Sequence, residues 1–173
     1  MKDILPDVLT LNLNIVFCGT AAGNESARQG AYYAHPGNKF WSTLYTVGLT
    51  PRQLRPAEFA EVLHYGIGLT DLAKFVSGND DTLSPQDFDP SALADKIYSL
   101  RPKVLAFTSK TAGSIFLRSK RIVFGLQPEM IGTTSMFVLP SPSGLARRSW
   151  DIAHWSAAAA FVRPTINSSV DQP

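Results

Sequence analysis

The sequence predicts an α/β fold with a mostly parallel sheet that helices cover on both faces. Four short apolar runs alternate with stretches whose apolar residues repeat at helical spacing. Such alternation is typical of parallel sheets, because each crossover carries a helix over one face. Of the 173 residues 45% are apolar, so one core is expected within a single domain, residues 1–163. The polar tail, residues 164–173, is expected to fray.

The first half of the chain predicts two strands and two helices. Asn14–Cys18 (NIVFC) is a short apolar run that is typical of a buried strand. A helix is expected over Asn38–Val47, where apolar residues share one face. A second helix begins at Pro56 and stops at Gly66. Ile67–Leu72 (IGLTDL) is a short second strand or the exit from one.

The second half alternates in the same way. Its predicted elements are a helix from Asp89-Pro90 to Pro102, a strand at Val104–Thr108, a helix capped by Ser109, a strand at Met136–Leu139 and a helix after Ser149. Open sheets of this kind bind ligands beyond the carboxyl ends of their strands. Those ends carry GTAAGNES, GLTDLAK, TSKTAG and LPSPSGLARR, so four polar loops are expected to converge on one rim.

Composition excludes several classes of function. Cys18 is the single cysteine, which rules out an internal disulfide and any site built from several thiolates. The three histidines show no ligand-like spacing, so no metal is expected. No apolar run approaches the roughly 18 residues of a membrane span. The N-terminus also lacks the layout of a signal peptide, and a soluble cytoplasmic protein is expected.

The charge is mildly basic and unevenly distributed. Formal net charge is +2, and the isoelectric point is about 8.8. Two clusters stand out, Lys110 with Arg118, Lys120 and Arg121, and the pair Arg147-Arg148. The mild excess permits an anionic partner without requiring one, and a solvated surface is the simpler explanation of the charges alone.

The loop after the first strand and the segment that follows it could hold a base. The glycines of Gly19–Gly23 allow a close approach of the backbone to a ligand, but the spacing matches neither a P-loop nor a dinucleotide-binding turn. The next segment gathers polar and aromatic residues, namely Asn24, Glu25, Tyr32, Tyr33, His35 and Asn38. They form either core aromatics with a helix cap at Asn38 or a stacking platform beside polar groups, as a flipped base requires.

The loop Leu139–Arg148 (LPSPSGLARR) has features of a phosphate and duplex contact. Its stiff Pro-Ser-Pro-Ser-Gly run offers hydroxyl and N–H groups suited to phosphate. Leu145 follows at the tip, ahead of two arginines. An apolar tip beside cations can enter a base stack while the charges hold the backbone. The alternative is an ordinary turn with Leu145 packed inward.

These motifs together resemble a known family. VFCG, AHPGNKFW, GLTDL and VLPSPSGLARRS follow one another from about Ile15 to Trp155, in an order that resembles mismatch-specific uracil/thymine DNA glycosylases of the uracil-DNA glycosylase superfamily. The resemblance implies a three-layer α/β/α sandwich with a four-stranded, mainly parallel sheet. It implies hydrolysis of the N-glycosidic bond of flipped-out uracil, which leaves an abasic site in base-excision repair. It implies no cofactor and a DNA partner containing uracil or abasic sites; a monomer is the default.

The resemblance also implies roles for individual residues. Toward the substrate it assigns the turn Gly19, Thr20, Ala21 and Gly23, the stacking ring of Tyr33 with His35 beside it, and the base-reading Asp71. Toward the DNA backbone it assigns Ser109 and Lys110 at a helix start, and the loop residues Ser141, Ser143, Gly144, Leu145 and Arg147, with Leu145 as the wedge. For Asp71, a helix N-cap at the strand exit is an equally common role.

The first motif departs from the family pattern. The family reads Gly-Ile-Asn-Pro-Gly, whereas this chain reads Gly-Thr-Ala-Ala-Gly, so Ala21 replaces the asparagine that positions water. Ser141 likewise replaces an asparagine. The segment YYAHPGNKFW, together with Asp71, resembles a neighbouring branch that excises hypoxanthine and implicates Asn38.

Three residues are therefore candidates for positioning the water, namely Asn24, Glu25 and Asn38. Glu25 could equally pair with Arg28 on the surface. Backbone N–H donors that stabilise the departing base are typically worth about 10²–10³ in rate, so loss of the asparagine need not abolish activity. Uracil excision is the first hypothesis. Hypoxanthine excision and weakly catalytic binding of uracil or abasic DNA are the alternatives.

Overall fold

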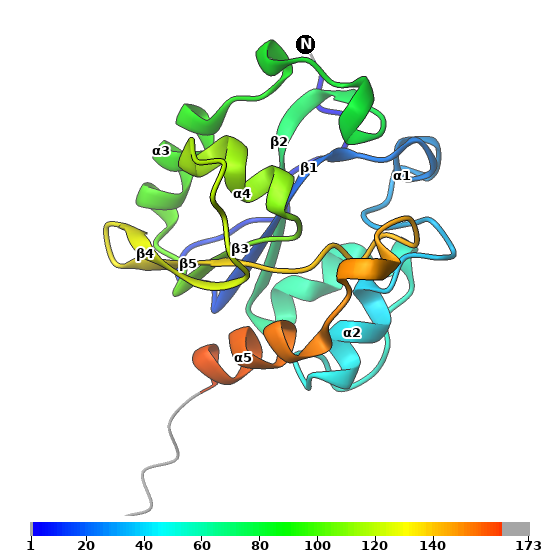
Figure 1. The fold of residues 1–173 in the computed structure, drawn as a ribbon. Helices are drawn as coiled ribbons and strands as arrows, with labels where there is room; N and C mark the ends of the chain where they lie inside the picture. The colour runs from blue at the N-terminus through cyan, green and yellow to red at the C-terminus, as the bar shows by residue number, and fades with distance from the viewer. Residues whose placement is uncertain (1, 164–173) are drawn as a thin grey trace, which may run out of the picture.

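A five-stranded sheet forms the centre of the protein, with strand order β2-β1-β3-β5-β4 (Figure 1). The computed structural model describes residues 2–163, so the tail expected to fray lies outside the described residues. The strands are β1 (Ile15–Ala22), β2 (Ile67–Ser77), β3 (Val104–Phe107), β4 (Gly125–Ile131) and β5 (Thr134–Val138). All neighbouring pairs are parallel except β4 with β5, which is antiparallel.

Helices cover both faces of this sheet (Figure 1). They are α1 (Asn24–Gln29), α2 (Phe40–Thr46), α3 (Pro90–Leu100), α4 (Lys110–Leu117) and α5 (Ile152–Val162), with 3-10 segments at Pro56–Tyr65, Asp80–Thr82, Pro85–Asp87 and Arg147–Ser149. One core lies between the sheet and α2 and α5, and the other lies beneath α3 and α4. The predicted α/β architecture with a mostly parallel sheet is confirmed.

Side-chain alternation along the strands decides which residues face each layer. In β1, Ile15 and Phe17 enter the core beneath α2 and α5, whereas Val16 and Cys18 enter the core beneath α3 and α4. Successive strand residues point to opposite faces, so Gly19 continues the α2–α5 side. Gly19 pairs with Asp71 of β2, which puts both residues on that side at the carboxyl end of the sheet.

Three of the α-helices have a polar side chain as N-cap, and two of these caps were predicted from the sequence. The Asp89 carboxylate accepts a hydrogen bond from the Ala92 N–H at 2.9 Å, and the Ser109 hydroxyl accepts one from the Ala112 N–H at 3.0 Å. Asp151 caps α5 in the same way. Each cap satisfies an N–H group that a first helical turn leaves without an intrahelical partner.

The structure corrects the predicted sheet at three places. It has five strands rather than four, because β4 adds an antiparallel edge strand. The glycine-rich segment expected as a loop continues β1 to Ala22, and β2 extends to Ser77. Asp71 therefore lies inside β2, and no helix begins there for it to cap. β4 is mostly exposed and contains Pro128, so its sequence lacks the apolar run typical of a buried strand.

None of the helices within residues 2–163 is long and apolar enough to span a membrane.

Candidate functional site

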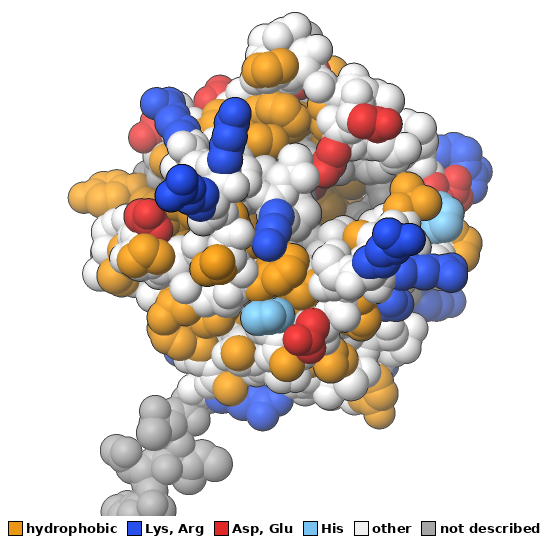
Figure 2. All heavy atoms as spheres, viewed as in Figure 1, with side chains coloured by type: hydrophobic (Ala, Val, Ile, Leu, Met, Phe, Trp, Pro, Cys, Tyr) orange, Lys and Arg blue, Asp and Glu red, His pale blue; other side chains and the backbone are white. Residues whose placement is uncertain are grey.

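The predicted site residues converge at the carboxyl end of the sheet. β1, β2, β3 and β5 all end on this side, and the loop after β5 reaches over it (Figure 1). The surface is hollowed here, with acidic side chains on one rim and basic side chains on another (Figure 2). The four predicted segments do meet at this end of the sheet, but only in part as loops, because GTAA continues β1 and GLTDLAK lies within β2.

Three polar groups meet beside Gly19. A Cβ atom at Gly19 would lie 2.6 Å from Asp71 Oδ1, and 3.7 Å from both the Thr108 and Tyr33 hydroxyl oxygens. A side chain at position 19 would displace the Asp71 carboxyl, so glycine at this position leaves room for that carboxyl. Thr108 follows β3 directly, and sequence reasoning did not select it as a site residue. Its position at the end of a predicted strand was the signal that could have found it.

The Asp71 carboxyl is buried, with 6% of its surface exposed. Burial raises its pKa to about 7, and Asp7 adds to the rise, while Lys74 and the Gly19 N–H oppose it. Near neutral pH this group therefore exists in both forms. The protonated acid can donate a hydrogen bond to a carbonyl oxygen, and the carboxylate can accept one from a ring N–H.

Tyr33 lies over this polar cluster in a strained backbone conformation. Its φ of 52° is in the left-handed region, which non-glycine residues rarely adopt. Its ring stacks on Phe40, with centroids 3.8 Å apart and planes 16° apart. Its hydroxyl lies 3.2 Å from the Thr108 hydroxyl. Tyr32 instead is buried in the core and donates to the Pro6 carbonyl, so only Tyr33 of the two is partly exposed.

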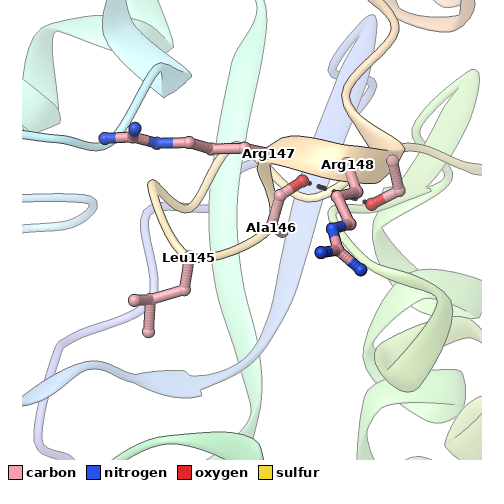
Figure 3. A pocket seen from close by; sticks show the side chains of 5 residues that line it. Leu145, Ala146, Arg147 and Arg148 are labelled. Carbon is pink, nitrogen blue, oxygen red and sulfur yellow. Dashed lines mark hydrogen bonds between the residues drawn. The ribbon is translucent and has the colours of Figure 1, made fainter.

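The loop after β5 presents Leu145 to solvent, with 86% of its surface exposed (Figure 3). The alternative in which Leu145 packs inward is wrong. Two hydroxyls brace the loop, because Ser141 and Ser143 each accept an N–H from two residues ahead, both at 3.3 Å. Arg147 donates to the Gly144 carbonyl at 3.2 Å. The five residues from Leu145 to Ser149 line a cavity of about 400 Å³.

This loop is fastened to the segment that carries Tyr33. The Lys39 N–H donates to the Pro142 carbonyl at 2.8 Å, and the Lys39 ammonium lies 4.9 Å from the Trp150 ring centroid. A Cβ atom at Gly144 would come within 3.1 Å of the Gly37 carbonyl oxygen, so the two loops are in close contact. The loop that carries Leu145 and the segment that carries Tyr33 are thus joined by direct contacts.

The three residues selected for positioning water lie in different surroundings. Asn24 is the exposed first residue of α1. Glu25 pairs with Arg28 at 2.5 Å, and this partner lowers the pKa of Glu25 to about 2, with a further hydrogen bond from Gln29. Asn38 Oδ1 accepts the Phe40 N–H at 2.9 Å, and Asn38 also lines a cavity of about 430 Å³ that it shares with Tyr33 and His35.

Other predicted residues lie around this centre. Thr20 donates to the Asp80 carboxylate at 2.5 Å, a contact that no sequence signal indicated. Ser109 is engaged in capping α4, and the Lys110 ammonium lies 4.5 Å from the Phe124 ring centroid. Ala21 and Gly23 are partly exposed at the end of β1. His35 is exposed and accepts the Gly37 N–H at 3.0 Å.

The donor set of the described residues does not form a metal site. Within residues 2–163 no group of three or more histidine, cysteine, aspartate or glutamate side chains comes together. The polar groups present are a carboxyl, two hydroxyls and exposed amides, which suit hydrogen bonding to an organic ligand.

Comparison with known families agrees with this geometry. The family model of the uracil DNA glycosylase superfamily matches residues 6–161, which is most of the chain. The chain belongs to the uracil DNA glycosylase superfamily. Membership implies DNA glycosylase chemistry, in which the bond between a base and its deoxyribose is hydrolysed. The matched region contains all of the site residues discussed above.

A solved structure of this fold is similar in shape. It is the solution NMR structure of a candidate uracil DNA glycosylase from Methanosarcina acetivorans, with a TM-score of 0.65 and 23% sequence identity. The match covers 93% of this chain and 96% of that chain. At this level of identity the likeness shows the fold alone.

Proposed function

We propose that the protein is a monofunctional DNA glycosylase that removes flipped-out uracil and leaves an abasic site. The observation that carries the proposal is the direct contact between the loop of an exposed apolar tip, Leu145, and the segment of a stacking ring, Tyr33, above a buried polar cluster. A wedge can fill the gap that a flipped nucleotide leaves, while a slot with an aromatic wall holds the base.

The slot has the groups that uracil requires. Uracil offers a ring N–H between two carbonyl oxygens. The base is proposed to lie against Gly19, around which the Asp71 carboxyl and the hydroxyls of Tyr33 and Thr108 are arranged. A protonated Asp71 donates to a base carbonyl on which negative charge grows as the glycosidic bond breaks, and donors placed at such a charge lower the barrier.

Among the three candidates for positioning water, Asn38 has the best support. The ion pair with Arg28 keeps Glu25 ionised with a low pKa, which makes it a weak base near neutral pH. Asn38 borders a cavity with Tyr33, although the lining of that cavity does not include Gly19, Asp71 or Thr108. Its amide oxygen accepts the Phe40 N–H, which leaves the amide nitrogen as the group proposed to hold a water molecule or the sugar. Asn24 is exposed and close in sequence, and it remains the second candidate.

Hypoxanthine is the second candidate substrate. The stretch from Gly19 to Gly23 at the end of β1 has no side chain larger than that of Thr20, which favours a bicyclic base over the smaller pyrimidine. Hypoxanthine also presents a carbonyl beside a ring N–H, so Asp71 can read it by the same contacts. The third possibility, a binding protein with weak catalysis, follows from Ala21 in place of the family asparagine.

One gel assay tests these alternatives. The protein is incubated with labelled oligonucleotides that carry a single U:G, U:A, single-stranded U or hypoxanthine, and abasic sites are then cleaved with alkali. Strand breaks on uracil substrates are the expected result. Strand breaks on the hypoxanthine substrate alone would identify hypoxanthine, and not uracil, as the base that is excised. A shifted band without breaks on any substrate overturns the enzymatic proposal and leaves the binding protein.

A further inference from the structure

A long part of the chain is almost free of acidic residues. From Lys96 to Trp150 the sequence has nine Lys and Arg residues and one acid, Glu129, although the whole chain has 16 basic and 14 acidic residues. Two of the nine cations are Arg147 and Arg148, in the chain between β5 and α5 that carries Leu145, which we call the Leu145 loop. Three others, Arg118, Lys120 and Arg121, lie at the end of α4 and just after it, and we call them the basic segment.

The basic segment is exposed and uncompensated. All three side chains are exposed, and among the described residues none of them forms an ion pair. Lys and Arg side chains gather over α4 and the chain after it, on the face that also shows the hollow (Figures 1 and 2). Clustered cations without nearby acids attract polyanions.

Phe124 connects the basic segment to the proposed DNA-binding edge. Gly125 pairs with Val138, the last residue of β5, so Phe124 lies at the carboxyl end of the sheet, near the point where the Leu145 loop begins. The Lys110 ammonium lies over the Phe124 ring at 4.5 Å, and His154 lies against the same ring at 5.3 Å between centroids. From Lys110, α4 runs for eight residues, or roughly 12 Å, to Arg118.

We propose that the basic segment is a second DNA contact, which binds phosphates of the duplex flanking the damaged nucleotide. The inference rests on the proposed function for the position of the DNA. Each strand has one phosphate per about 3.4 Å of duplex axis, so a distance equal to the length of α4, measured along that axis, spans about three or four base pairs. The contact is independent of sequence, because it involves the backbone and no base edge.

Salt dependence of binding tests the proposal with a matched control. Lys120→Gln/Arg121→Gln removes two charges from the basic segment. Arg101→Gln/Lys103→Gln removes the same charge between α3 and β3, at the opposite end of the sheet. The probe is a fluorescein-labelled 25-base-pair duplex with one tetrahydrofuran abasic analogue, and the readout is anisotropy at several salt concentrations. Circular dichroism melts verify that both variants fold.

The basic-segment variant is expected to bind about tenfold or more weakly at 0.1 M salt, and its slope of log K against log salt should fall by about 1.8. The control pair should leave both values unchanged. Leu145→Ala is expected to weaken binding without changing the slope. If the basic-segment variant and the control pair give the same affinity and slope, the proposal is overturned.

Shortening the duplex gives a second, independent readout. Removing base pairs from one side of the abasic analogue should abolish the difference between wild-type protein and the basic-segment variant, whereas shortening the other side should preserve it. A difference that survives both truncations contradicts a flanking contact. Base excision by the wild-type protein is measured in parallel, because its absence would contradict the proposed function and not this surface.

Discussion

The Tyr33 hydroxyl lies 3.2 Å from the Thr108 hydroxyl, although 75 residues separate the two in the chain. This contact and the stack on Phe40 hold the Tyr33 ring at the carboxyl end of the sheet. One ring face is covered by Phe40, so the other is the face that a base can use. These contacts also hold the Tyr33 backbone in the left-handed region, a conformation that is strained for a non-glycine residue.

Two substitutions at Tyr33 separate its ring from its hydroxyl. Tyr33→Phe keeps the stacking surface, and we expect single-turnover excision within a fewfold of the wild-type rate. Tyr33→Ala removes the surface, and we expect excision efficiency to fall about 10- to 100-fold, since base–aromatic stacking is worth about 1–3 kcal/mol. If the two variants are equally slow, the hydroxyl and not the ring carries the function.

The sequence predicts the buried strands and capped helices of this protein well. Ile15 to Cys18 and Val104 to Phe107 are fully buried apolar runs, and Asp89 and Ser109 cap the helices that they were expected to cap. These features depend on local pattern and local hydrogen bonds. β4 was missed because an exposed edge strand is stabilised by pairing with β5, which leaves no periodic apolar signal.

The candidate site was only partly predictable, because it too depends on contacts between segments that are distant in the sequence. Tyr33, Asp71 and Leu145 were selected as candidates by their motifs, and their roles stay predictions. Their surroundings depend on contacts between distant segments, such as Thr108 beneath Tyr33 and Gly37 against Gly144. The extension of β1 through Gly19 to Ala22 depends on its pairing with β2. No single-sequence pattern encodes such pairings.

Leu145 should matter only where a base must be displaced from a duplex. Leu145→Ala is expected to lower excision from U:G and U:A duplexes by roughly tenfold or more, because the wedge offsets part of the few kcal/mol of unstacking. Excision from single-stranded uracil should change little. Met130→Ala, at another exposed apolar residue on β4, is the control. Equal losses on single and double strands would contradict the wedge role.

The protonation of Asp71 should appear in the rate of base excision. Its pKa of about 7 means that the donor form is lost as pH rises through neutrality. If that form stabilises the departing base, the single-turnover rate should fall above about pH 7. Asp71→Asn retains a donor that does not titrate, so its profile should be flat there. A wild-type rate that instead rises through pH 7 would assign the active form to the carboxylate.

The same group should make stability depend on pH. The folded protein keeps the Asp71 proton up to about pH 7, whereas the ordinary pKa of an aspartate is 3.8. Between these values the folded state binds more protons than the unfolded chain, so stability falls as pH rises. The full shift corresponds to on the order of 4 kcal/mol. In melts at pH 5 and pH 8, Asp71→Asn should lose much of this decline, and Asp95→Asn, at an exposed carboxylate, should not.

Asn38 and Glu25 can be distinguished by substitutions that preserve their structural contacts. Asn38→Ser keeps an oxygen that can cap the Phe40 N–H but removes the amide, so we expect near-normal melting with a single-turnover rate reduced by about 10²-fold or more. Asn38→Ala should lower the rate similarly and also cost about 1 kcal/mol of stability through the lost hydrogen bond from the Phe40 N–H.

Glu25→Gln is expected to leave the rate within a fewfold of wild type, because the Glu25 carboxylate is committed to Arg28. If Glu25→Gln were instead the slow variant and Asn38→Ser the fast one, the ion pair would have to open during the reaction, and Glu25 would become the group that orients the water. Asn24→Ala, measured in the same series, completes the assignment. If all three single variants keep full activity, none of these residues positions the water, and the group that does so lies elsewhere in the protein.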